Sequence, residues 1–161
     1  MRILGIDPGF AITGYSVIDY TGNKFKLITS GSIQTKAGVS FPLRLSKIYD
    51  ELEILINNYK PEAMAVEELF FNDNIKTGIN VSQARGVILL IGSKLGVDLF
   101  EYTPLQVKQA VVGYGRADKK QVQKMVQSIL KIDKIAKLDD ITDSMAIAIC
   151  HAHSSKFAEK L

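Results

Sequence analysis

The sequence predicts an α/β fold in which a mixed five-stranded sheet is flanked by helices on both faces. Two observations support this fold class. Before residue 35 the chain contains three short runs with strand character and turn signals between them, which is typical of neighbouring antiparallel strands. After residue 41, apolar strand-like runs alternate with segments of helical periodicity, which is typical of parallel strands joined by helices. We expect the 161 residues to form a single domain, 1–161.

Each of the three N-terminal strands is predicted from a local pattern. Residues 3–6 form an apolar run that ends at Asp7, where a Pro-Gly pair breaks it. Residues 13–20 and 24–34 alternate between apolar and polar side chains, and the Thr-Gly-Asn sequence at 21–23 is typical of a tight hairpin turn. We therefore expect three antiparallel strands at the N-terminus.

The rest of the chain predicts five helices and two further strands. Apolar residues recur at helical spacing over 42–59, with Pro42 in the first turn and Pro61 after the end. Residues 63–66 are apolar without interruption, as in a strand buried on both faces, and this run ends at Glu67. The remaining predicted elements are a helix over 75–95, a strand over 97–102, and helices over 104–111, 119–130 and 139–153.

The composition favours an intracellular protein. Cys150 is the single cysteine, so no internal disulfide can form, and we expect it to be inert core. No apolar run approaches the roughly 18 residues of a membrane span, and the N-terminus lacks a signal-peptide pattern. We expect a cytoplasmic protein that does not enter a membrane.

The charges are distributed unevenly along the chain. The net charge is only +3, but residues 104–137 contain eight basic and two acidic residues, so the remainder of the chain is net acidic. A solvated lysine-rich helix would give the same composition. The asymmetry nevertheless indicates a cationic face beside a separate acidic site.

Four carboxylates are candidate metal ligands. Asp7 and Glu67 each follow a buried strand, at the edge of the sheet where ligands of α/β proteins bind. Asp140 and Asp143 are three residues apart at the start of the last helix and can project from one face. Two carboxylates 4 Å apart repel each other by about 4 kcal/mol at an effective dielectric constant of about 20, so such a cluster requires a cation.

The donor set indicates which cation and which chemistry. Oxygen ligands select Mg²⁺ or Mn²⁺, and two such ions about 3.5–4 Å apart can activate a water and stabilise the leaving oxygen of a phosphodiester. Each acid also has an ordinary structural explanation. Asp7 could be a turn residue, and Asp139 or Asp140 could cap the last helix. Glu67 is harder to explain structurally, because an acid that directly ends a buried run is costly without a partner.

Five segments of the sequence resemble the bacterial RuvC family of Holliday junction resolvases. In order they are LGIDPGFAITGYSVI, MAVEELFF, SQARGVILL, EYTPLQVKQAVVGYGRADKKQVQKMV and DDITDSMAIAICHAH, and they are distributed along nearly the whole chain, from residue 4 to residue 153. The resemblance implies a ribonuclease H-like fold, a homodimer and Mg²⁺-dependent cleavage of two symmetric strands of a four-way DNA junction. It also implies cooperation with the branch-migration proteins RuvA and RuvB.

The resemblance assigns roles to individual residues. The four catalytic, metal-binding acids of the family match Asp7, Glu67, Asp140 and Asp143, although some members have histidine in place of Asp140. The lysines that support DNA binding or catalysis match Lys108 and Lys119, and Lys119 could instead contact only the DNA backbone. The aromatic residue that contacts junction bases matches Phe70, which we favour over its neighbour Phe71. With the DNA substrate that the resemblance implies, we expect the charges of Arg116, Lys120 and Lys124 to hold phosphates.

Further candidates are two histidines, an aromatic residue and a helix. We expect His151 and His153 to lie at the surface or at a helix end rather than to shuttle protons. Tyr114 lies between two glycines and is a candidate for stacking on an unpaired base, but we expect its ring to be packed into the loop. The helix over 75–95 carries small residues that permit close approach, and we expect it to contribute to a twofold dimer that matches the twofold junction.

Three other functions have some support. The Asp-Pro-Gly segment with Thr13-Gly14 also resembles the phosphate-binding hairpin of actin-like ATPases and sugar kinases, but those proteins need two lobes. A second alternative is another ribonuclease H-like nuclease, such as one that trims ribosomal RNA precursors. The third is a junction-binding module without catalysis. Metal-dependent nicking of a four-way junction distinguishes among them.

Overall fold

The fold is built on one mixed sheet. The computed structural model describes residues 1–69, 75–134, 137–155 and 160–161. The strands lie in the order β3-β2-β1-β4-β5. β1 pairs antiparallel with β2 and parallel with β4, β2 and β3 are antiparallel, and β4 and β5 are parallel. Their bounds are Arg2–Asp7 for β1, Ile12–Thr21 for β2, Lys24–Gln34 for β3, Ala63–Glu67 for β4 and Asp98–Tyr102 for β5.

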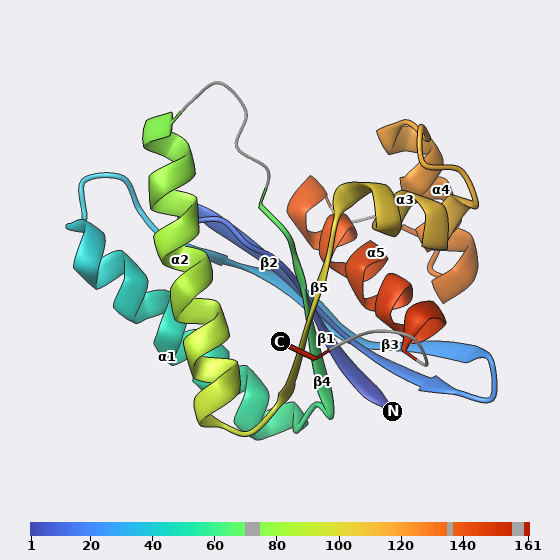
Figure 1. The fold of residues 1–161 in the computed structure, drawn as a ribbon, viewed down its shortest axis with the longest axis horizontal. Coiled ribbons are helices and arrows are strands. Elements are labelled where there is room, and N and C mark those ends of the chain that lie inside the picture. The colour runs from blue at the N-terminus through green and yellow to red at the C-terminus, as the bar shows by residue number, and fades with distance from the viewer. Residues whose placement is uncertain (70–74, 135–136, 156–159) are drawn as a thin grey trace.

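Helices cover both faces of this sheet (Figure 1). α1 and α2 lie on one face, and α3, α4 and α5 lie on the other. The helices span Phe41–Tyr59 for α1, Ile75–Lys94 for α2, Pro104–Val112 for α3, Lys119–Leu130 for α4 and Asp139–Ser154 for α5. The predicted fold class is confirmed, and every predicted element agrees with the structure to within one residue at each end. None of the described helices combines the length and the apolar character that a membrane crossing requires.

Strand alternation decides which side chains face which helices. On β1, Ile3 packs in the core under α5, whereas Leu4 and Ile6 pack in the core under α1 and α2. Successive side chains of a strand point to opposite faces, so Asp7 is on the α5 side. On β4, Ala63 and Ala65 pack in the core under α5. By the same alternation, Glu67 also lies on the α5 side.

Two glycines let α5 lie directly on the sheet. A Cβ atom at Gly5 of β1 would overlap the backbone carbonyl oxygen of Ser144, and one at Gly14 of β2 would overlap that of Asp140. Gly14 is also the register partner of Asp7. The close approach therefore brings the first turn of α5 to the end of β1.

Gly5→Ala is expected to destabilise the fold by about 3 kcal/mol, because the added methyl group forces α5 away from the sheet. Gly86→Ala is the matched control, with both variants unfolded at a protein concentration low enough to dissociate a dimer formed through α2. A Cβ atom at Gly86 of α2 meets no atom within 4 Å, so this change should stabilise the protein by roughly 0.5–1 kcal/mol. Urea unfolding measures both effects. Equal stability of the Gly5→Ala variant and the wild type would contradict the packing argument.

One expectation about a single side chain was wrong, and another was confirmed only in part. His151 lies in the last turn of α5, at the helix end, but it is buried, with 1% of its area exposed. Its Nδ1 lies 2.8 Å from the Tyr102 hydroxyl oxygen, and burial lowers its pKa to about 4. Tyr114 is 56% exposed rather than packed into its loop. It directly follows Gly113, the left-handed residue at the end of α3. His153 is exposed and Cys150 is buried, as expected.

Candidate active site

Four carboxylates approach one another at one edge of the sheet. Asp7 ends β1 and Glu67 ends its parallel neighbour β4, so the two lie at the same edge. Asp140 and Asp143 come from the first turns of α5, which Gly14 holds against β2. Glu67, Asp143 and Asp140 all raise the pKa of Asp7 through their charges. The structure therefore brings together the four acids singled out in the sequence.

Burial and mutual repulsion perturb the ionisation of this cluster. Burial raises the pKa of Asp7 to about 8, and the charges of Glu67, Asp143 and Asp140 add to the shift. Burial also raises the pKa of Glu67 to about 7, with Asp143 adding to it. The pKa of Asp143 is raised as well, again chiefly by burial. Without a compensating cation, the cluster retains protons at neutral pH.

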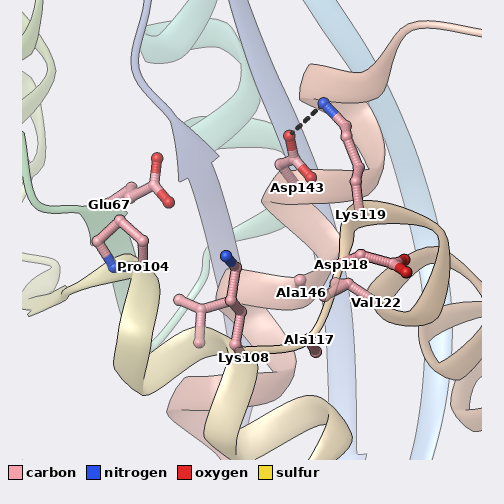
Figure 2. A pocket seen from close by; sticks show the side chains of 10 residues that line it. Glu67, Pro104, Lys108, Ala117, Asp118, Lys119, Val122, Asp143 and Ala146 are labelled. Atoms are coloured by element: carbon pink, nitrogen blue, oxygen red, sulfur yellow. Dashed lines mark ion pairs between the residues drawn. The ribbon is translucent and has the colours of Figure 1, made fainter. Parts of the chain in front are cut away.

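A pocket of about 250 Å³ lies beside these acids, between β4 and helices α3, α4 and α5 (Figure 2). Glu67 and Asp143 line it from the sheet and from α5, and Lys108 and Lys119 line it from α3 and α4. Acidic and basic groups thus meet around one opening. Such a site can take a substrate that carries negative charge together with the cations that accompany it.

Lys119 is held at the rim of this pocket by two carboxylates. Its Nζ lies 3.0 Å from Asp139 Oδ2 and 3.4 Å from Asp143 Oδ2. Partial burial acts to lower the pKa of Lys119, but these carboxylates outweigh that effect and raise it. The ammonium is therefore charged and is aimed at the acidic cluster.

Local sequence explains why α4 begins at Lys119. Asp118 caps α4: its side chain accepts a hydrogen bond from the backbone N–H of Gln121, whose side chain accepts one from the backbone N–H of Asp118. Asp118 also lines the pocket. The sequence analysis missed this residue, although the Asp-x-x-Gln spacing of a capping box was readable.

The capping role considered for Asp139 or Asp140 was wrong. The residue that caps α5 is Leu138, and it makes no side-chain capping bond. Asp139 instead accepts a hydrogen bond from Gln123 Nε2 at 3.1 Å and pairs with Lys119. No sequence signal could reveal this pairing, because it depends on how α4 packs on α5.

The other candidate DNA-binding residues differ in their position relative to the pocket. Lys108 lines it, whereas Arg116, Lys120 and Lys124 are exposed on the loop before α4 and on α4 itself. Phe70 and Phe71 lie outside the described residues. Lys108 and Lys119 form a basic rim of the pocket, and Arg116, Lys120 and Lys124 lie on α4 or on the loop before it.

The donor set fits a hard divalent cation. Within the described part of the chain, no three His, Cys, Asp or Glu side chains already form a metal-binding group. The acids are nevertheless close enough to raise the pKa of Asp7, and all their donors are oxygen. The ammonium of Lys119 beside Asp143 shows that the cluster attracts a cation. Mg²⁺ and Mn²⁺ prefer such ligands.

The fold and the position of the acids define the class of protein. A mixed sheet in the order β3-β2-β1-β4-β5, with α5 packed across β1 and β2, is the ribonuclease H-like fold. Acids at the ends of β1 and β4 and on α5 lie at one edge of that sheet. The chain is therefore an α/β protein of the ribonuclease H-like class.

Comparisons with known proteins identify the family. Residues 3–151 match the family described as crossover junction endodeoxyribonuclease RuvC. Relatives of that name from Ruminiclostridium cellulolyticum and Alkaliphilus oremlandii are 55% and 54% identical, over 100% and 99% of this chain and 97% of each relative. The chain belongs to the RuvC family of crossover junction endodeoxyribonucleases, and the resemblance seen in the sequence is confirmed.

A solved structure agrees with this assignment. T. thermophilus RuvC, in complex with a Holliday junction substrate, matches with a TM-score of 0.95 and 32% identity. The match covers 100% of this chain and 99% of that one. The similarity extends over the whole fold and includes every element that positions the candidate site.

Proposed function

We propose that this chain, as a single nuclease domain, is a Holliday junction resolvase. It makes paired symmetric nicks in four-way DNA junctions during recombination and repair, and leaves 5′-phosphate and 3′-hydroxyl ends that a ligase can seal. The observation that carries the proposal is the acidic cluster around Asp7 beside the basic rim of α3 and α4. The similarity to a RuvC that was solved with junction DNA supports the choice of substrate.

The four acids are the metal ligands in this proposal. Asp7, Glu67, Asp140 and Asp143 would hold two Mg²⁺ ions per subunit, and Mn²⁺ would substitute for them. When bound, such ions activate a water and stabilise the leaving oxygen of a phosphodiester. Asp7 and Glu67 must lose the protons that their raised pKa values favour. Lys119 donates a hydrogen bond to the phosphate oxygen on which charge develops.

The basic rim holds the DNA backbone. Lys108 lies at the pocket and contacts the phosphate nearest the acids, while Arg116, Lys120 and Lys124 contact phosphates further away. Phe70 would stack on a junction base, a contact worth about 1–3 kcal/mol. Phosphate contacts fix the register of the DNA, and the stacked ring favours an opened junction centre over plain duplex.

Replacing Lys120 and Lys124 together by alanine is expected to weaken junction binding regardless of sequence. Each lost phosphate contact should reduce the slope of log K against log salt by about 0.9, so the pair should reduce it by about 1.8. Fluorescence anisotropy at several salt concentrations measures this slope. The control is the same double change at Lys24 and Lys26, which are exposed at the start of β3, at the end of the sheet away from Asp7. An unchanged slope in the α4 variant would exclude these contacts.

The protein acts as a homodimer in this proposal, because a junction offers two equivalent strands. α2 presents exposed apolar residues, among them Ile79 at 51% and Leu90 at 53% exposure. Leu90→Arg is expected to convert a micromolar dimer to a monomer, since a charge would be buried at the interface. Sedimentation velocity measures the change, with Met125→Arg on α4 as the control. A wild type that sediments as a monomer with and without DNA would contradict the dimer.

The decisive assay uses a synthetic four-way junction, the matching linear duplex and a structured RNA. We expect nicking of the junction only, with Mg²⁺ and not with EDTA. Cleavage of the RNA would favour an RNA-trimming nuclease, and binding without nicking would favour a non-catalytic module. Because the DNA substrate of a bacterial cell lies in the cytoplasm, we place the protein there, with RuvA and RuvB as partners.

A further inference from the structure

Asp139 makes contacts that the four proposed ligands do not account for. Its Oδ2 lies 3.0 Å from Lys119 Nζ, closer than Asp143 Oδ2 at 3.4 Å. Its Oδ1 accepts a hydrogen bond from Gln123 Nε2 at 3.1 Å. Asp139, the first residue of α5, thus contacts side chains in the first two turns of α4. Together with Asp143 it pairs with the ammonium of Lys119.

These contacts of Asp139 do not cap the N-terminus of α5. The N-cap residue of α5 is Leu138, which makes no side-chain capping hydrogen bond, so Asp139 does not cap the helix. Lys119 is placed independently, because the capping box of Asp118 and Gln121 fixes the start of α4. The remaining freedom is that of the long lysine side chain, which is 52% exposed and would otherwise sample many rotamers.

We propose that Asp139 is a positioning residue for Lys119. When a divalent cation engages Asp143, that cation repels the ammonium, and Asp139 then keeps Lys119 beside the site instead of releasing it to solvent. The inference rests on the proposed function, in which Asp143 binds metal and Lys119 contacts the phosphate. Because Asp139 is 56% exposed, its pair with Lys119 is screened by solvent and the expected effects are modest.

The first test separates catalysis from binding. Asp139→Asn should lower the single-turnover cleavage rate of a saturated junction about fivefold, with the junction Kd unchanged. Asp139→Glu should restore most of the rate, because it keeps a carboxylate within reach of Lys119. Asp133→Asn, an exposed acid on the connection between α4 and α5, is the charge-matched control and should cut at the wild-type rate. An Asp139→Asn variant that cuts as fast as the Asp133→Asn control overturns the proposal.

A double-mutant cycle identifies the residue through which Asp139 acts. If Asp139 works through Lys119, Asp139→Asn should cause no further loss of rate in a Lys119→Met background. If the two losses multiply instead, Asp139 acts independently of Lys119 and the proposal is wrong.

A third measurement does not depend on cleavage. In calorimetric titrations of Mg²⁺ without DNA, Lys119→Met should strengthen metal binding, because it removes the ammonium that competes for Asp143. Asp139→Asn should weaken Mg²⁺ binding about threefold, because Lys119 then pairs with Asp143 alone and competes more strongly for its carboxylate. This loss of affinity should vanish in the Lys119→Met background. A wild type that binds Mg²⁺ but does not cut would refute the proposed function only. Equal Mg²⁺ affinity of Asp139→Asn and wild type would refute the positioning role.

Discussion

Asp7→Asn is expected to abolish junction cleavage and to leave junction binding intact. Burial raises the pKa of Asp7 to about 8, and the charges of the carboxylates around it add to the shift. Asparagine keeps the shape of the side chain but removes the negative charge at the centre of the proposed metal site. We expect a loss in single-turnover rate of about a thousandfold or more, because the proposed ions supply several kcal/mol of charge stabilisation. Gel-shift titration should give the wild-type Kd.

Asp50→Asn is the control for this change. Asp50 is exposed on α1, on the face of the sheet away from the cluster. The same loss of one charge there should not alter the cleavage rate. An Asp7→Asn variant that cuts at a rate close to that of Asp50→Asn would remove Asp7 from the chemistry.

The stability of the metal-free protein is expected to fall as the pH rises from 6.5 to 8.5. The folded-state pKa of Asp7 is raised from 3.8 to about 8, and that of Glu67 from 4.5 to about 7. In this window the folded state binds more protons than the unfolded state, so the free energy of unfolding decreases with pH. The contribution of these acids is fully present below pH 4 and is lost as the pH passes their folded-state values. The expected loss in this window is about 2–3 kcal/mol.

This pH window avoids the opposing effect of a buried histidine. The pKa of His151 is lowered to about 4, so its contribution to stability rises between about pH 4 and its ordinary value of 6.5. Above pH 6.5 that contribution rises by only about 0.4 kcal/mol more, which is small beside the loss expected from the acids. Urea unfolding in EDTA at pH 6.5, 7.5 and 8.5 therefore reports the acidic cluster.

Two comparisons attribute the effect to the cluster. Asp7→Asn should flatten most of the pH dependence and should be more stable than the wild type at pH 8.5 without metal. Mg²⁺ should restore the stability of the wild type at pH 8.5, because it binds the ionised site of the folded state and not the unfolded chain. A wild-type stability that is constant or rising between pH 6.5 and 8.5 in EDTA would contradict the account of the cluster.

The elements could be predicted from sequence because each one rests on a local pattern. The apolar runs that end at Asp7 and Glu67 show where two strands stop, and parallel pairing places both ends at one edge. The approach of Asp140 and Asp143 to that edge depends on close packing at Gly5 and Gly14. Small residues permit such contact but do not specify it, so the acids could be proposed from sequence and placed only by the structure.

The errors came from features that tertiary packing decides. His151 lies at a helix end, as one of its two expected positions, but its burial was not predicted, because α5 is buried on nearly all sides from Ser144 to Ala152. The contacts of Lys119 depend on the packing of α4 against α5, which no spacing in the sequence encodes. A position in a helix can be predicted from periodicity, whereas its neighbours on other elements cannot.

The central claim is that the acids around Asp7 form one site for divalent cations. Anomalous scattering from crystals grown with Mn²⁺ and a four-way junction tests it most directly. The account predicts Mn²⁺ peaks in contact with the carboxylate of Asp7 and with carboxylates of Glu67, Asp140 or Asp143. Mn²⁺ bound elsewhere, with no peak at Asp7, would contradict it.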